Sequence, residues 1–99
     1  MYRYLVMTAR TPQFQMSVID EHYAFLDRLR QQGKLELAGP FTDKSGGAYL
    51  IKAASLEEAR TVAFSDPVHT TNSSIVTVYE WSKVTMVPPS SYKGMQEAR

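Results

Sequence analysis

The fold is decided by residues 35–63, which read LELAGPFTDKSGGAYLIKAASLEEARTVA. An apolar run at 35–42 is followed by the turn residues DKSGG at 43–47, and a second apolar run follows at 48–53. Two apolar segments joined by glycine-rich turn residues predict a β-hairpin. Pro40 favours an edge position for the first of these strands, because proline has no N–H group to donate to a central ladder.

The same stretch continues into a helix. Residues 55–58, SLEE, have the spacing of a capping box, in which the serine and the second glutamate satisfy free N–H groups at a helix start. Leu56, Ala59 and Ala63 then recur at the spacing of one helical face. The residue before proline avoids the α conformation, so we expect this helix to end at the Asp66-Pro67 step. Residues 74–81, SIVTVYEW, predict a last strand.

A strand and a helix are also predicted upstream of the hairpin. Residues 2–9, YRYLVMTA, are rich in aromatic and aliphatic side chains and form the expected first strand. Ser17 and Asp20 have the spacing of a capping box and predict the start of a helix, and Gly33 is suited to its end. One face of this helix is expected to carry Ile19, His22, Tyr23, Leu26 and Leu29.

The resulting order, β-α-β-β-α-β, predicts an α+β fold of the split βαβ kind, with two helices on one face of a four-stranded antiparallel sheet. The strands are apolar on both faces: Tyr4 and Val6 alternate with neighbouring aliphatic residues, and Tyr79 and Trp81 do so near the end of the last strand. Stable monomers rarely leave such a face exposed, so we expect a homodimer that packs one sheet on the other. The domain is predicted to span 1–83, and 84–99 to form a tail or arm.

Composition excludes several classes of function. The chain has 99 residues, enough for one domain, and 43% of them are hydrophobic. Its net charge of +1 gives no reason to expect nucleic acid or a membrane as a partner. Cysteine is absent, which excludes disulfides and thiolate chemistry. No segment resembles a signal peptide or a membrane span, so a cytoplasmic location is the default expectation. No motif for phosphate, nucleotide or flavin is present, and we expect no cofactor.

His22 and Asp66 are the candidate catalytic residues. In this topology the first helix starts at the end of the sheet where the second helix finishes, so both side chains are expected to meet or to share a cavity. The pair has two interpretations. In the first, Asp66 orients the imidazole and stabilises its protonated form, while the other ring nitrogen moves a substrate proton. In the second, the pair is a structural hydrogen bond that joins the two helices.

Other polar and aromatic residues give weaker hypotheses. His69 lies three residues after Asp66, and with His22 it would complete a two-histidine, one-carboxylate metal triad. The pair of His22 and Asp66 alone is favoured over this triad, with no metal, and His69 is instead assigned to the substrate. Tyr4, Phe41 and Tyr49 are predicted to line a pocket that accepts aromatic molecules. The hydroxyls of Thr70, Thr71, Ser73 and Ser74 suggest a serine nucleophile, but no oxyanion-hole motif accompanies them.

The chain resembles the YCII-related (YciI-like) family. The likeness lies in Glu21-His22-Tyr23, in Ala38-Gly39-Pro40-Phe41, in Gly46-Gly47, in the SLEEA at 55–59 and in Asp66-Pro67, and it covers residues 1 to 83. The resemblance implies a ferredoxin-like domain that assembles as a dimeric α/β barrel. It also implies a pocket that contains the family's histidine and aspartate, which correspond to His22 and Asp66. The family resemblance also suggests an activity, because one characterised kind of family member is similar to a dehydrochlorinase that acts on a chlorinated hydroxyhydroquinone.

Two functions are therefore carried forward. The first is a small cofactor-independent lyase or isomerase, which transfers a proton on a compact oxygenated or aromatic molecule with the His22–Asp66 pair. The second is a dimer of the same fold that binds a small ligand or a partner without catalysis. A catalytic site should leave one nitrogen of His22 facing an open cavity, whereas a structural pair should be sealed from solvent.

Overall fold

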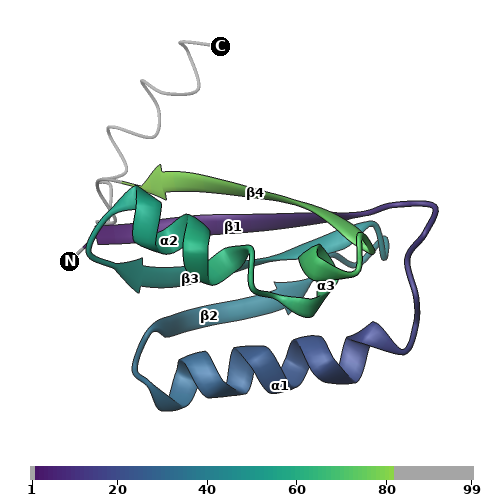
Figure 1. Ribbon diagram of the computed structural model, residues 1–99, viewed down its shortest axis with the longest axis horizontal. Helices are drawn as coiled ribbons and strands as arrows, with labels where there is room; N and C mark the ends of the chain where they lie inside the picture. The colour runs from purple at the N-terminus through teal and green to yellow at the C-terminus, as the bar shows by residue number, and fades with distance from the viewer. Residues whose placement is uncertain (1, 82–99) are drawn as a thin grey trace, which may run out of the picture.

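The computed structural model describes residues 2–81, so the tail predicted at 84–99 and the domain boundary at 83 lie outside the described residues. Seven elements follow one another along these residues (Figure 1): β1 (Tyr2–Arg10), α1 (Val18–Gln31), β2 (Leu35–Pro40), β3 (Gly46–Ala53), α2 (Leu56–Ala63), α3 (Pro67–Thr70) and β4 (Ser74–Trp81). The predicted order of strands and longer helices is confirmed. The short helix α3 was not predicted.

The four strands form one antiparallel sheet in the order β2-β3-β1-β4. This arrangement is the ferredoxin-like α+β fold expected from the sequence. β2 lies at an edge of the sheet, as Pro40 predicted, and its pairing with β3 is irregular between Leu35 and Leu37. β1 and β3 are therefore the central pair of strands.

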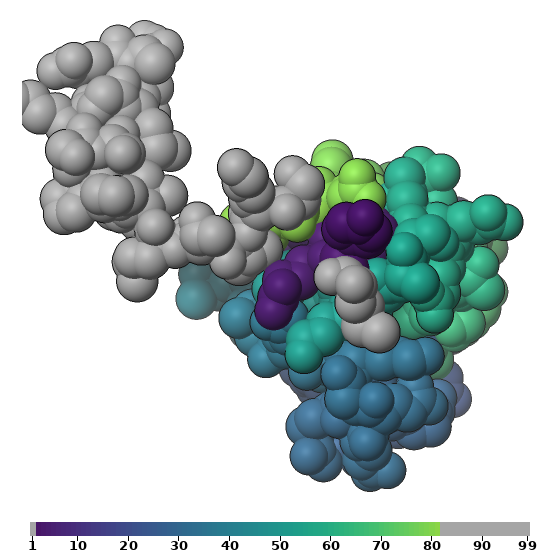
Figure 2. Space-filling view, turned by 90° about the vertical axis from the view of Figure 1, so that its left-hand side faces the viewer, coloured from purple at the N-terminus to yellow at the C-terminus, as the bar shows by residue number. Residues whose placement is uncertain are grey.

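The helices pack on one face of the sheet, and the core lies between the two layers. α1 runs beside β2, while α2 and α3 lie across the other strands (Figure 1). Figure 2 shows the molecule from the end at which β1 begins. In this view α2, in teal, lies to the right of β1, and the blue residues, which include α1, lie below β1. The buried apolar side chains of this core are Tyr4, Val6, Val18, Phe25, Leu26, Leu29, Tyr49, Ile51, Ala53, Ala59, Ala63, Val68 and Val76.

The ends of α1 differ in how well the sequence predicted them. Ser17 is the residue before the helix, but its backbone is already helical and its side chain makes no capping hydrogen bond, so the predicted capping box is wrong. The preceding turn provides the start instead, since the N–H of Val18 donates to the carbonyl of Gln15. At the other end, Gly33 has a φ of 73°, and Lys34 donates to the carbonyl of Leu29. This is the left-handed glycine ending that the sequence predicted.

The buried face of α1 is rotated from the predicted one. Val18 and Phe25 are buried together with Leu26 and Leu29, whereas Tyr23 is about half exposed. Positions 18, 22, 25 and 29 follow the four- and three-residue steps of a single stripe, which faces the sheet. His22 lies on this stripe and therefore points inward.

The second helix is shorter than predicted. α2 starts at the predicted cap, where the side chain of Ser55 accepts a hydrogen bond from the N–H of Glu58. It ends at Ala63, three residues before Asp66, and the chain then turns. Asp66 is extended and caps the separate helix α3, with Pro67 at its first position. Asp66 thus points inward because it is a cap, not because it continues the stripe of Ala59 and Ala63.

Gly46 permits the close approach of β3 to β1, and its replacement is expected to be costly. A Cβ atom on Gly46 would lie 1.8 Å from the carbonyl oxygen of Thr8, which is backbone that cannot move aside without shifting β1. We expect Gly46→Ala to lower the free energy of unfolding by about 3 kcal/mol or more. Gly39→Ala is the matched control, because a Cβ there has no atom within 4 Å. Urea denaturation at one protein concentration measures both, and equal stabilities would contradict this account of the β1–β3 contact.

Candidate functional site

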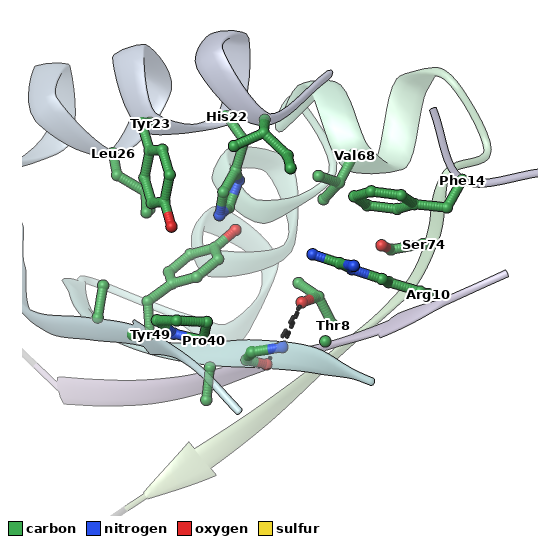
Figure 3. A pocket seen from close by; sticks show the side chains of 16 residues that line it. Thr8, Arg10, Phe14, His22, Tyr23, Leu26, Pro40, Tyr49, Val68 and Ser74 are labelled. Atoms are coloured by element: carbon green, nitrogen blue, oxygen red, sulfur yellow. Dashed lines mark hydrogen bonds between the residues drawn. The ribbon is translucent and has the colours of Figure 1, made fainter. Parts of the chain in front are cut away.

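A cavity of about 270 Å³ opens between α1 and the end of the sheet where β1 finishes (Figure 3). Its lining is mainly apolar and aromatic, with a few polar groups that converge on it. This composition is typical of sites for small organic molecules, and the volume suits a compact one. The lining consists of Thr8, Arg10, Phe14, Ile19, His22, Tyr23, Leu26, Ala38, Gly39, Pro40, Gly46, Gly47, Ala48, Tyr49, Val68 and Ser74.

His22 and Asp66 are in direct contact, as the topology predicted. The Nδ1 atom of His22 lies 2.9 Å from each carboxylate oxygen of Asp66. The carboxylate has no exposed surface, whereas the imidazole is partly exposed and lines the cavity. The contact joins the second turn of α1 to the cap of α3 and ties the two helices together.

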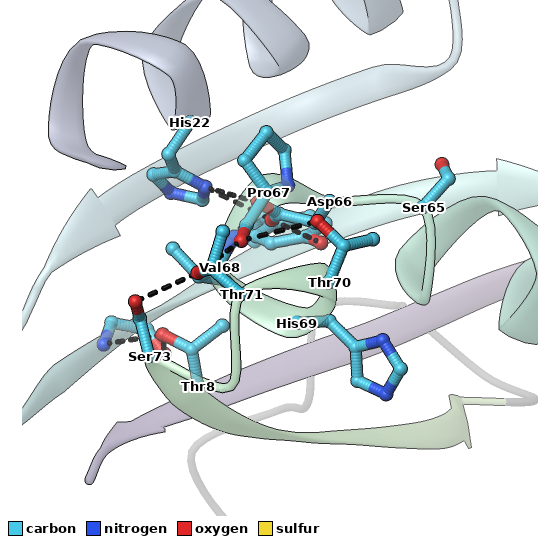
Figure 4. A network of polar contacts seen from close by, with 12 residues as sticks. Thr8, His22, Ser65, Asp66, Pro67, Val68, His69, Thr70, Thr71 and Ser73 are labelled. Carbon is cyan, nitrogen blue, oxygen red and sulfur yellow. Dashed lines mark hydrogen bonds and ion pairs between the residues drawn. The ribbon is translucent and has the colours of Figure 1, made fainter. Parts of the chain in front are cut away.

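Three donors surround the Asp66 carboxylate. The imidazole of His22 points toward it (Figure 4). The backbone N–H of Val68 donates to Oδ1 at 3.0 Å, and the hydroxyl of Tyr49 donates to Oδ2 at 3.0 Å. A buried carboxylate needs such compensation for its lost hydration. An ionised carboxylate only accepts hydrogen bonds, so the proton of a neutral His22 is on Nδ1. The lone pair of Nε2 is then free to accept a proton.

The phenol of Tyr49 is held in its neutral form. Burial, followed by the charge of Asp66 and the hydrogen bond to it, raises the pKa of Tyr49 far above its ordinary value. A phenol that keeps its proton is a permanent donor to Asp66, and it leaves both carboxylate oxygens with more than one hydrogen bond. Tyr49 and Val68 therefore hold the carboxylate from the protein interior, while His22 lies between the carboxylate and the cavity.

Removing this hydroxyl gives a test of the network. Tyr49→Phe is expected to lower the free energy of unfolding near neutral pH by about 1.5–3 kcal/mol, the usual value of a hydrogen bond to a charged group. Above its ordinary pKa of 10.0, Tyr49 loses its proton in the unfolded state but keeps it in the folded state. The wild type therefore loses stability from this group as pH rises above about 10, by up to ~1.4 kcal/mol per pH unit. The difference in free energy of unfolding between the wild type and Tyr49→Phe should therefore narrow as pH rises above about 10.

Thermal or urea denaturation across neutral and alkaline pH measures this effect. Tyr23→Phe is the control, since Tyr23 is half exposed and its hydroxyl has no hydrogen bond to another described residue. If the difference in free energy of unfolding stays constant at all pH values, Tyr49 has the same pKa in the folded and unfolded states, which would contradict this account.

His69 does not join this site. Its Nδ1 atom lies 2.9 Å from the carbonyl oxygen of Phe64, and its ring stacks on that of Phe64 at 4.7 Å between centroids. Figure 4 shows the imidazole on the opposite side of α3 from His22. Within residues 2–81, no three His, Cys, Asp or Glu side chains are placed to hold a metal ion. The metal triad and the assignment of His69 to the substrate are therefore both at odds with its position.

Of the three aromatic residues predicted to line the pocket, only Tyr49 does so. Tyr4 is buried, with its hydroxyl 3.1 Å from Glu80. It lies four residues before Thr8 on the same face of β1, about 13 Å from the cavity end. Phe41 closes the hairpin, where its N–H donates to the carbonyl of Gly46. The alternation along a strand predicts which face a residue is on, but not how far along that face a cavity begins.

Thr70, Thr71 and Ser73 in the hydroxyl cluster near the histidines are structural, whereas Ser74 lines the cavity. The side chain of Ser73 is within 2.7 Å of the hydroxyl of Thr71 and accepts from the N–H of Gln15. Neither contacts a histidine, and Thr70 and Thr71 both donate to the carbonyl of Pro67. These bonds hold α3 against the loop before α1, and no serine nucleophile is formed.

Several cavity residues were not identified from the sequence. Thr8 and Arg10 are the last two residues of β1 on the helix-facing side, continuing the alternation of Tyr4 and Val6. The alternation predicted which residues of β1 face the helices, but not that the last two of them line a cavity.

None of the helices within residues 2–81 has the length and hydropathy that a bilayer-spanning segment requires.

Two solved structures share this fold. One is the 5-chloro-2-hydroxyhydroquinone dehydrochlorinase (TftG) of Burkholderia phenoliruptrix AC1100, in complex with 2,5-dihydroxybenzoquinone. It superposes with a TM-score of 0.66 at 22% identity, over 83% of this chain and 95% of that chain. The other is an antibiotic biosynthesis monooxygenase, with a TM-score of 0.59 at 14% identity, over 86% of this chain and all of that chain. At these identities the likeness concerns the fold.

Sequence comparison gives a more specific relationship. The chain is 47% identical over 81 residues to the uncharacterised protein YjpA of Bacillus subtilis (strain 168), an alignment that spans 82% of this chain and 95% of that protein. The sequence model of the YCII-related domain matches residues 2–82. With most of its length matched, the chain belongs to the YCII-related domain family.

Proposed function

We propose that this protein is a small cofactor-independent enzyme that transfers a proton on a compact oxygenated or aromatic molecule, as a lyase or an isomerase. One observation carries the proposal. His22 is bonded through Nδ1 to both oxygens of a buried aspartate, while the same imidazole lines a cavity. A purely structural pair would not need an open cavity beside the ring.

The steps follow from the protonation states of the pair. Nε2 of His22 accepts a proton from an acidic C–H bond of the bound molecule, and the electron pair of that bond delocalises onto a neighbouring oxygen. Asp66 stabilises the imidazolium that forms and holds the ring in place. The imidazolium then returns the proton to another carbon, which gives an isomer. In a lyase, the delocalised electron pair instead forms a carbon–carbon double bond as the bond from carbon to the leaving group breaks, and the imidazolium protonates that leaving group.

The fold relatives support this substrate class. The dehydrochlorinase of the same fold is described with a hydroxylated, ring-shaped substrate and with a dihydroxybenzoquinone bound. In this chain, a single ring fits the cavity volume and the aromatic lining from Tyr23, Tyr49 and Phe14. Aromatic side chains favour offset or edge-on contact with such a ring.

The proposed enzyme is a homodimer that pairs the sheet faces opposite the helices. Leu37, Leu5 and Tyr79 lie on that face in one row across the strands, with Leu50 between the first two. Ile75 and Trp81 are exposed on the same face. An apolar face of this extent is typical of an interface between proteins.

Hydrogen exchange tests the proposal without knowledge of the complete reaction. The protein is incubated in D₂O with a panel of hydroxylated aromatics, quinones and small cyclic ketones, and deuterium on carbon is followed by proton NMR. Proton transfer by Nε2 should accelerate deuterium uptake into at least one compound, and the acceleration should require His22.

Exchange no faster than the buffer rate for every compound, while some of them bind in the cavity, would favour the second function, a dimer that binds a small molecule without catalysis. Binding is measured on parallel samples in H₂O through the backbone amides of Thr8, Gly47 and Ser74, which line the cavity.

A further inference from the structure

We propose that Arg10 is the recognition residue of this cavity and that its ligand carries an anionic oxygen, a carboxylate or a phenolate, on a compact planar ring. The inference deepens the proposed function, because it names the charge of the molecule that the same cavity takes. It concerns binding alone, and it therefore stands or falls separately from catalysis.

The position of Arg10 follows from the strand. β1 ends at this residue, which pairs with Ser74 and belongs to the helix-facing side of the sheet. Thr8, the previous residue on that side, forms the floor of the cavity through its hydrogen bonds with Gly47. Figure 3 shows the guanidinium of Arg10 directed toward the middle of the cavity, on the side away from Leu26.

Phe14 holds the guanidinium in place. The centre of the Arg10 guanidinium lies 4.1 Å from the centroid of the Phe14 ring, which is the geometry of a cation–π contact. Such stacking covers one flat face of the guanidinium and leaves its N–H edges available. A guanidinium fixed in this way donates two parallel hydrogen bonds to a carboxylate at a small entropic cost.

The charge of Arg10 is not neutralised by the described residues. The carboxylates of the described ion pairs contact Arg3, His22 and Arg30. No Asp or Glu is among the residues that line the cavity, where Arg10 is the one permanently charged group. Asp66 lies beneath the surface, without exposure, and is occupied by its three donors. A ligand anion would therefore meet a positive potential in a partly enclosed apolar site.

The remaining lining defines the rest of the ligand. Ile19, Leu26 and Val68 are aliphatic, and Tyr23 and Tyr49 are aromatic. These side chains favour a flat apolar body, while His22 and Arg10 are polar groups on the same cavity. A ring that places one anionic oxygen near Arg10 and a hydrogen-bearing atom near His22 would contact both polar groups and the apolar lining.

Matched pairs of probes test the inference. Benzoate and benzamide have nearly the same shape and differ in charge. In the phenolic series, 4-nitrophenolate and 4-nitroanisole differ in charge and by the methyl group of the ether. Dissociation constants are measured by NMR titration of the backbone amides. We expect each anion to bind about ten- to a hundredfold more tightly than its neutral partner, the usual effect of a hydrogen bond between charged groups. The series with the larger preference identifies the ligand group.

Variants assign the preference to Arg10. Arg10→Met should abolish it and leave the affinity for benzamide unchanged, and Arg10→Lys should restore part of it through charge without the paired hydrogen bonds. Arg60→Met is the control, because it removes an equal charge from α2, outside the cavity. Unperturbed amides of Ile51 and Ala53, which are buried in β3 outside the cavity lining, show that each variant is folded.

Equal affinity of the wild type for anion and neutral partner would overturn the inference, as would an anion preference that survives in Arg10→Met. Failure of all four probes to shift a cavity amide at millimolar concentration would overturn it as well. None of these three results depends on deuterium exchange. An anion preference without exchange would leave this inference standing and reject the enzymatic function, and the converse would do the opposite.

Discussion

Replacement of His22 by alanine is expected to lower the rate of the proton transfer by about a hundred- to ten-thousand-fold, the usual contribution of a well-placed acid–base group. The imidazole is partly exposed at the cavity, so its loss removes the proton acceptor while the core beneath it stays packed. The protein should remain folded. The measurement is the rate of deuterium uptake, or of the complete reaction once a substrate is found.

Two further variants separate catalysis from structure. His69→Ala is the matched control, because His69 is outside the cavity and bonds to Phe64, and it should keep the full rate. Asp66→Asn should retain a weaker activity, since an amide oxygen can still accept from Nδ1 of His22 but does not stabilise imidazolium as a carboxylate does. If His22→Ala and Asp66→Asn both lower the melting temperature and neither changes exchange or ligand binding, the pair is structural.

A single acidic residue on the open sheet face is expected to dissociate the proposed homodimer. Leu37 and Ile75 each have 65% of their surface exposed and lie on strands at the two edges of the sheet. Burial of such a side chain contributes about 1.5–3 kcal/mol, and an unpaired carboxylate in its place would cost several kcal/mol more. Two-fold symmetry doubles the effect, because both copies carry the change. Ile75→Glu should therefore raise the dimer dissociation constant by at least about a thousandfold.

Light scattering and tryptophan fluorescence measure this change. The chain has one tryptophan, Trp81, and it lies on the open face, so its emission should shift to the red when the dimer dissociates. Met16→Glu is the control, since Met16 is equally exposed but lies in the loop before α1. A wild type that is monomeric at micromolar concentration would reject the dimer, as would an Ile75→Glu variant that stays dimeric.

The sequence predicted those parts of the fold that depend on local pattern. Strand alternation is a property of neighbouring residues, and it placed the four strands and distinguished their two faces. Pro40 marked the edge strand because its missing N–H is a covalent fact, and Gly33 ended α1 because its conformation is left-handed. The capping box at Ser55 was correct, whereas the similar spacing at Ser17 was not, since there a preceding turn already satisfies the free N–H groups.

The sequence by itself also predicted that His22 and Asp66 meet or share a cavity, because the topology brings the start of α1 and the end of α2 to one end of the sheet. Only the tertiary structure decided how they meet. Asp66 is buried and oriented because it caps α3, where the N–H of Val68 donates to one carboxylate oxygen, and because the hydroxyl of Tyr49 on β3 donates to the other. The cavity likewise depends on Arg10, which contacts Phe14 nearby in the chain but shares the cavity with residues of α1, β2 and β4. Contacts across the sheet and between layers set the depth and the charge of a site, and no local pattern contains them.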